Sequence, residues 1–203
     1  MRQINRLNEE ISRWAFEIRT KNSPDWFIAF TNPTAGPWKT IKAQSLKTQE
    51  IGEVYRFALE EDRPDIIMYN DNLKCAIIFE AKDSLNKLTE QEQVKKSVDV
   101  VKKLAKKMRI EITNDFWSGR NNYNILLGLL WGSTDESESS STKELLFDQY
   151  HNGVISDKNV FVDAIVGVET LYKNNDLKCE LFYKCYSKGC EKLLLDLKNS
   201  FKL

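Results

Sequence analysis

Two apolar runs separated by one amphipathic segment constrain the fold of this chain more than any other feature. The runs are residues 74–79 (KCAIIF) and residues 123–131 (YNILLGLLW), and their length and composition are typical of buried strands. Between them, apolar residues recur every three or four positions over residues 88–109, which predicts a long helix. A strand, a helix and a strand in this order predict a parallel crossover, so the chain is expected to have an α/β core.

The helix expected over residues 88–109 carries its own start signal and its own buried face. Thr89 and Glu92 have the spacing of a capping box. The residues expected on the buried stripe are Val94, Val98, Val101, Leu104 and Met108. The basic residues of this segment are then expected on the solvated side of the helix.

Other segments complete a single domain of 203 residues with a mixed central β-sheet flanked by helices. Helices are expected over residues 3–20, 143–150 and 191–201, and two strands over 160–170 and 177–186, joined as a hairpin through 173–176. Residues 48–61 fit either a helix or a strand. The acidic, serine-rich stretch 133–142 (STDESESSST) has the composition of a mobile loop that does not pack.

Charged residues stand at the ends of two neighbouring strands. The turn signal Asn70-Asp71-Asn72 separates a strand over residues 66–69 from the run 74–79, and Glu80 and Lys82 extend the second strand. Side chains two apart on a strand point to the same face. If the two strands pair antiparallel through the turn, Asp65 lies beside Glu80, and three charged groups meet at one edge of the sheet.

Two carboxylates held a few ångströms apart repel each other, so such a pair requires a shared proton or a bound cation. Oxygen ligands alone favour Mg²⁺ or Mn²⁺ over zinc, and Mg²⁺ commonly keeps water and substrate phosphate oxygens in its shell. This chemistry suits phosphodiester hydrolysis, in which Lys82 would orient or help to deprotonate the attacking water and offset negative charge.

Pro64-Asp65, a spacer of fourteen residues and Glu80-Ala81-Lys82 together resemble the PD-(D/E)xK nuclease superfamily, most of whose known members are type II restriction endonucleases. The resemblance covers residues 64–82. It implies that Asp65 and Glu80 ligate the metal, that the main-chain carbonyl of Ala81 adds a ligand and that Lys82 is the catalytic lysine. It also implies a restriction-endonuclease-like fold, with a mixed sheet flanked by helices.

Two alternatives stay open around this motif. A Pro-Asp pair is a common strand opener, and a Glu-x-Lys at a strand end is often a solvated ion pair. Many members of the superfamily carry a further acidic residue on an upstream helix. Four glutamates are candidates for it, and the sequence does not choose among them: Glu10, Glu17, Glu50 and Glu53.

Lys plus Arg and Asp plus Glu both number 30, so the net charge is zero and affinity for DNA must come from segregated patches. The turn-rich loop 31–42 offers one such patch, because its backbone amides with Trp38, Lys39 and Lys42 could contact a phosphate track. The alternative is an ordinary surface loop with Trp38 packed into the core.

Cysteine and histidine usage argues against other catalytic chemistries. The four cysteines, one of which is Cys75 in an expected strand, form no C-x-x-C pair, so reduced thiols are expected rather than zinc ligands. His151 is the single histidine and stands in a polar, turn-like segment, 149–153, where a solvated loop residue is expected. No signal peptide and no membrane-spanning run is visible, so a cytoplasmic protein is expected.

The leading functional hypothesis is a Mg²⁺-dependent type II restriction endonuclease that cuts double-stranded DNA, with Mn²⁺ able to substitute. The resemblance implies a homodimer, because a two-fold protein matches a palindromic duplex. One alternative is a structure-specific or repair nuclease, such as a resolvase or the nicking subunit of a heteromeric enzyme. Another is a non-catalytic α/β module that binds nucleic acid or protein.

Overall fold

A mixed β-sheet forms the centre of the computed structural model, which describes residues 25–31, 64–82, 84–110, 122–133, 139–155, 162–173, 176–185 and 190–200. Within these ranges the sheet has six strands, which follow one another across it in chain order. The strands are β1 (Phe27–Thr31), β2 (Ile66–Asn70), β3 (Cys75–Lys82), β4 (Asn124–Ser133), β5 (Ala164–Lys173) and β6 (Asp176–Cys185). The helices are α3 (Leu85–Leu88), α4 (Gln91–Ile110), α5 (Ser140–Ile155) and α6 (Cys190–Ser200).

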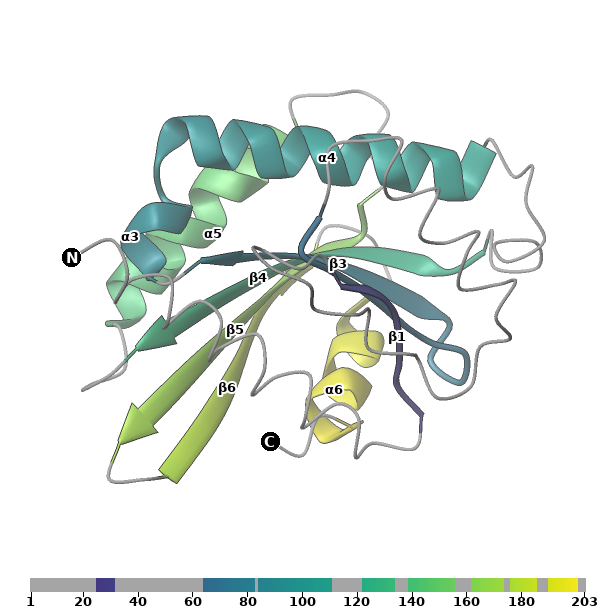
Figure 1. Cartoon of the computed structure of the whole chain (residues 1–203). Helices are drawn as coiled ribbons and strands as arrows, with labels where there is room; N and C mark the ends of the chain where they lie inside the picture. Colours follow the sequence, from purple (N-terminus) through teal and green to yellow (C-terminus); the bar gives the residue numbers. More distant parts are fainter. Residues whose placement is uncertain are drawn as a thin grey trace, which may run out of the picture.

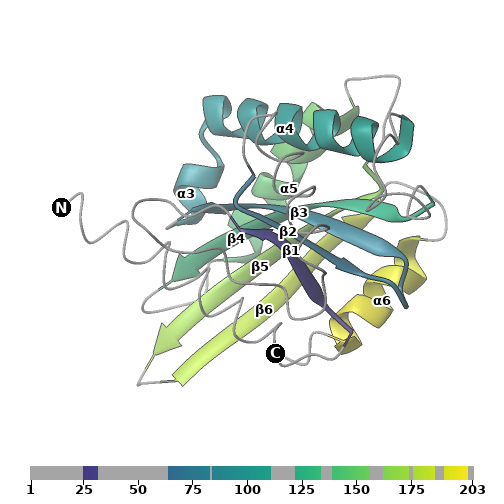
Figure 2. The same cartoon turned by 45° about the vertical axis from the view of Figure 1, so that its right-hand side comes forward.

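Helices cover both faces of the sheet. Figure 1 shows α3, α4 and α5 on one face and α6 on the other, and the turned view in Figure 2 shows the same division. β3 pairs with β4 and β4 with β5 in parallel, whereas the other neighbouring pairs are antiparallel. The α/β class, the mixed sheet and the parallel crossover through α4 are therefore confirmed.

The side chains of β3 alternate between two cores. Ala76 and Ile78 belong to the core beneath α3, α4 and α5, while Ile77, Phe79 and Ala81 belong to the core against α6. This alternation follows from the two-residue period of a strand. Glu80 and Lys82 therefore extend from the same face of β3, as their spacing predicts, and this face is the one that α4 covers.

A glycine in the central strand makes room for an aromatic ring on the α6 side. Gly128 of β4 pairs directly with Phe79 of β3, and a Cβ atom at Gly128 would lie only 2.2 Å from the ring. The absence of a side chain lets the ring lie across the strand. Phe79 is in turn completely buried and packs in the core beside α6.

Part of the serine-rich stretch predicted as a loop is regular structure, because Ser133 ends β4 and residues 140–142 form the first turn of α5. Ser139 caps this helix: its hydroxyl accepts a hydrogen bond from Thr142 N at 3.3 Å, and its carbonyl accepts one from Lys143 N at 3.1 Å. Serine is a preferred N-cap residue, so the composition that suggests a loop also supplies the start of a helix.

Two further local predictions are wrong. Thr89 does not cap α4, which begins at Gln91; it ends α3, and its hydroxyl donates to the Asn86 carbonyl at 2.8 Å. His151 does not lie in a loop, because α5 continues through it, and its side chain is half-buried. The helix extends beyond the predicted 143–150 at both ends, since it begins at Ser140 and continues through Gly153 to Ile155.

Several other predictions agree with the structure. The β5–β6 hairpin and the terminal helix α6 lie within a few residues of their expected bounds.

Other segments were not predicted or cannot be compared. The short aromatic stretch after residue 25 forms the edge strand β1, and no element was predicted there. The predicted helix at 3–20, the loop carrying Trp38 and the ambiguous segment 48–61 fall outside the described residues. In the described part of the chain, no helix has the length and apolar character needed to cross a membrane.

Candidate active site

The β2–β3 hairpin places Asp65 opposite Glu80. Ile66 pairs with Phe79 in an antiparallel register, and Asp65 N donates a hydrogen bond to the Phe79 carbonyl at 2.9 Å. Continuing the register by one residue sets Asp65 against Glu80. The hairpin turn is closed by Asn70, whose Oδ1 accepts the Leu73 amide at 2.9 Å. The antiparallel pairing on which the sequence argument depended is therefore confirmed.

Asp65 is a buried carboxylate that holds the end of β3. Its side chain crosses to the neighbouring strand, where Oδ2 accepts a hydrogen bond from Ala81 N at 2.7 Å. Only 6% of the residue is exposed. A buried carboxylate needs compensating hydrogen bonds or positive charge, because burial removes the water that would otherwise solvate it. The backbone amide supplies part of that compensation and fixes the orientation of the carboxylate.

Glu80 and Lys82 form an ion pair on the α4 side of β3. Lys82 Nζ lies 2.5 Å from Glu80 Oε1 and also donates to the main-chain carbonyl of Ala81 at 3.0 Å. The side chain of Glu80 is 9% exposed and that of Lys82 is 20% exposed. This is a partly buried pair rather than the solvated surface pair that the alternative interpretation of the motif describes.

A glutamine of α4 also binds Glu80, a contact absent from the sequence-based predictions. Gln93 Nε2 donates to Glu80 Oε1 at 2.8 Å and lies 2.9 Å from the hydroxyl oxygen of Ser97. Ser97 Oγ in turn donates to the Gln93 carbonyl at 2.9 Å. Two polar residues four positions apart on the inward side of an apolar helix are the signal that could have identified this contact.

Tyr150 of α5 packs beside this network. Its hydroxyl donates to the Leu88 carbonyl at 3.1 Å, which ties α5 to the last turn of α3. Burial raises the pKa of the Tyr150 phenol far above its ordinary value of 10.0, with a smaller opposing effect from Ser97 and a smaller raising effect from the Glu80 charge. Tyr150 therefore stays protonated at neutral pH and acts as a fixed donor.

On the sequence-based hypothesis that Glu80 is a metal ligand, we expect Gln93→Leu to weaken divalent-metal binding and any catalytic activity by about 10- to 100-fold, because residues that orient a metal-binding carboxylate typically contribute that much. The change keeps the size of the side chain but removes its donor to Glu80. Isothermal titration with Mn²⁺ measures the affinity. Gln91→Leu, an exposed position on the same helix, is the matched control. Equal affinity in the two variants would contradict a positioning role for Gln93.

The donor set of this edge suits a hard divalent cation. Asp65 and Glu80 supply carboxylate oxygens, and Ala81 supplies a main-chain carbonyl oxygen. The Lys82 ammonium group donates hydrogen bonds both to Glu80 Oε1 and to the Ala81 carbonyl. Both donors to Glu80 bind Oε1, so Oε2 takes part in neither contact. Among the described residues no group of three or more His, Cys, Asp and Glu side chains is placed to hold a metal.

The remaining candidate residues are not brought to this edge by the described structure. The four upstream glutamates, with Trp38, Lys39 and Lys42, lie outside the described residues. Cys75 is a buried cysteine in the core against α6 and forms no disulfide bond, as expected of a reduced core thiol.

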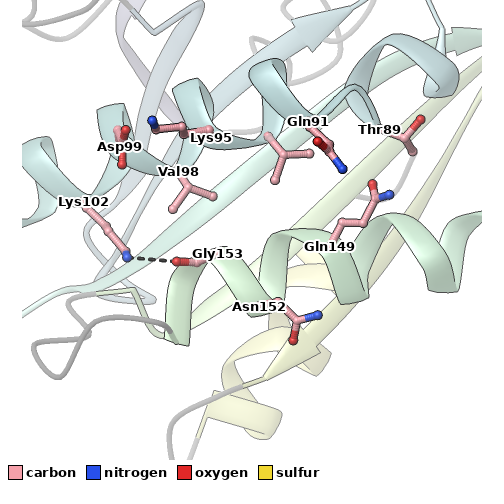
Figure 3. A pocket seen from close by; sticks show the side chains of 10 residues that line it. Thr89, Gln91, Lys95, Val98, Asp99, Lys102, Gln149, Asn152 and Gly153 are labelled. Atoms are coloured by element: carbon pink, nitrogen blue, oxygen red, sulfur yellow. Dashed lines mark hydrogen bonds between the residues drawn. The ribbon is translucent and has the colours of Figure 1, made fainter.

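A separate groove of about 490 Å³ runs between α4 and α5. Figure 3 shows amide side chains from both helices and charged side chains from α4 lining it, with the Lys102 amine reaching the Gly153 carbonyl at 2.9 Å. None of Asp65, Glu80 and Lys82 lines this groove. Its Lys102 bond serves to join the two helices that cover the candidate site.

No protein-family model, no curated protein and no solved structure matches this chain.

Proposed function

We propose that this protein is a Mg²⁺-dependent endonuclease that hydrolyses phosphodiester bonds in double-stranded DNA and acts as a type II restriction enzyme. The observation that supports this most is the meeting of Asp65, Glu80 and Lys82 at the end of one hairpin. Acidic oxygens beside a lysine are what a metal-assisted attack on a phosphodiester requires.

Each residue has a separate part in this proposal. Asp65 and Glu80 would hold the metal together with the Ala81 carbonyl, and the bound ion would activate water and offset charge on the phosphate. Lys82 would orient the attacking water and stabilise the additional negative charge on the phosphate oxygens. Gln93 would keep the Glu80 carboxylate in place.

The zero net charge favours a nuclease that reads bases over one that binds DNA shape alone. A resolvase holds its substrate mainly through phosphates, which calls for an excess of positive charge. We include a homodimer in the proposal because each subunit would then cut one strand of a palindromic site.

One observation favours a non-catalytic module as the second candidate. The Lys82 ammonium already neutralises Glu80, so the pair is also compatible with a purely structural role. A structural pair would leave the chain able to bind a partner but unable to cut DNA.

Digestion of a mixture of plasmid and phage DNA with Mg²⁺ separates these functions. We expect discrete fragments whose sequenced ends share one short motif, and we expect EDTA to abolish them. Cutting confined to branched DNA would instead identify a structure-specific nuclease. Absence of cleavage with Mg²⁺, Mn²⁺ or Co²⁺ on DNA of diverse sequence would reject the nuclease proposal in favour of the module.

A further inference from the structure

The cation that contacts Glu80 in this structure belongs to the chain itself. Lys82 Nζ contacts both Glu80 Oε1 and the Ala81 carbonyl, at 2.5 and 3.0 Å. The Glu80 carboxylate and the Ala81 carbonyl are two of the groups that the proposed function assigns to the metal as ligands. An ammonium group and a divalent ion a few ångströms apart repel each other strongly, so the two cannot share these oxygens.

We propose that Lys82 holds the metal position in the metal-free protein, and that a divalent ion displaces its ammonium group from Glu80 Oε1 and the Ala81 carbonyl. The inference rests on the proposed function for the place of the metal. It adds that binding is an exchange of one cation for another. The same event then frees the Lys82 amine to face a substrate phosphate.

The surroundings of Lys82 allow this exchange without movement of the sheet. Lys82 is the last residue of β3, and its side chain is 20% exposed, so the ammonium group has a path to solvent. A lysine stem has four flexible carbons and reaches several positions from one backbone site. The Gln93 amide stays bound to Glu80 Oε1 and keeps the carboxylate from following the lysine.

Displacement also explains why the site can be buried before any metal arrives. Asp65 and Glu80 are 6% and 7% exposed, and two buried carboxylates at adjoining positions would repel each other without a cation. The lysine supplies that cation during folding. Metal affinity is then reduced by the free energy needed to break the contacts of the lysine.

Mn²⁺ binding in the absence of DNA tests the proposal, with free Mn²⁺ followed by electron paramagnetic resonance. We expect Lys82→Met to bind Mn²⁺ about tenfold more tightly than the wild-type protein, because no internal cation competes. Lys82→Arg retains the charge and should not gain affinity. Lys106→Met removes an exposed lysine of α4 that lies about 20 Å along the helix from Gln93, and should match the wild-type protein.

The outcomes distinguish this inference from the proposed function. Equal or weaker Mn²⁺ binding by Lys82→Met overturns the displacement, whereas cleavage of DNA by the wild-type protein would still stand. If neither the wild-type protein nor its variants bind Mn²⁺, and the wild-type protein does not cleave DNA, both the displacement and the proposed function are rejected. If Lys82→Met does not fold, ¹³C-methylated lysines in the wild-type protein give a second measurement: the Lys82 signal should shift on addition of Mg²⁺ while that of Lys106 does not. An unchanged Lys82 signal rejects the displacement.

Discussion

Replacing Glu80 by glutamine is expected to reduce DNA cleavage at least about a thousandfold, equivalent to about 4 kcal/mol of transition-state stabilisation. The substitution keeps the shape of the side chain but removes the charge that would bind the metal. Single-turnover cleavage of a plasmid at saturating Mg²⁺ measures the effect. The loss should appear in the rate constant of the chemical step, because Glu80 is proposed to bind the metal and not the DNA.

Glu92→Gln is the matched control, since Glu92 is an exposed acid in the first turn of α4. It removes the same charge without touching the Glu80 contacts, so its cleavage rate should equal that of the wild-type protein. Thermal unfolding of both variants would exclude a general loss of structure. Glu80→Gln cutting at the wild-type rate would remove the central premise of the proposed mechanism.

The second large effect concerns stability, at a buried ion pair on the same face of the sheet. Lys143 Nζ lies 2.8 Å from Glu169 Oε2, and the two side chains are only 7% and 1% exposed. The ammonium also lies 4.0 Å from the centre of the Phe182 ring, which in turn stacks on Trp131. Removing one partner of such a pair leaves the other charge buried without its counterion.

We expect Lys143→Met to lower the free energy of unfolding by about 3–5 kcal/mol, as is typical when one member of a buried pair is removed. The double variant Lys143→Met with Glu169→Leu should recover most of that loss, because neither charge remains. Urea unfolding of the single and double variants gives the coupling between the two positions.

Lys96→Met, at an exposed position on α4, provides the comparison for this measurement and should change the stability by less than about 0.5 kcal/mol. A Lys143→Met variant as stable as Lys96→Met would show that the buried pair contributes little to folding. A double variant no more stable than the single one would show that the loss comes from packing against Phe182 instead.

Local sequence patterns predict the hairpin of the candidate site well. Residues 66–69 and 74–82 carry strand patterns on both sides of an asparagine-rich turn, so the meeting of Asp65 with Glu80 follows from neighbouring residues alone. The crossover between β3 and β4 is predicted for a similar reason, because each strand is a continuous apolar run. Patterns of this length contain all the information that these pairings need.

Contacts between elements that are distant in the chain could not be predicted from the sequence. Gln93 reaches Glu80 only because α4 crosses β3 at one particular angle, and Tyr150 reaches Leu88 only because α5 lies beside α3. Such angles depend on how whole faces of side chains pack, which no short pattern encodes. The prediction for the first turn of α5 was wrong for a different reason. Serine favours both loops and helix caps, and composition alone does not distinguish the two.

The acids and the lysine of the candidate site come from one uninterrupted stretch of eighteen residues, 65–82. Closing so short a loop costs little chain entropy, so Asp65 and Glu80 can meet early in folding, and α4 then contributes the Gln93 contact to Glu80. The sequence outside residues 65–82 can therefore change without altering the three charged residues of the candidate site. In a nuclease of the proposed kind, changes outside residues 65–82 would accumulate while the proposed chemistry stays the same, so one scaffold would acquire many specificities.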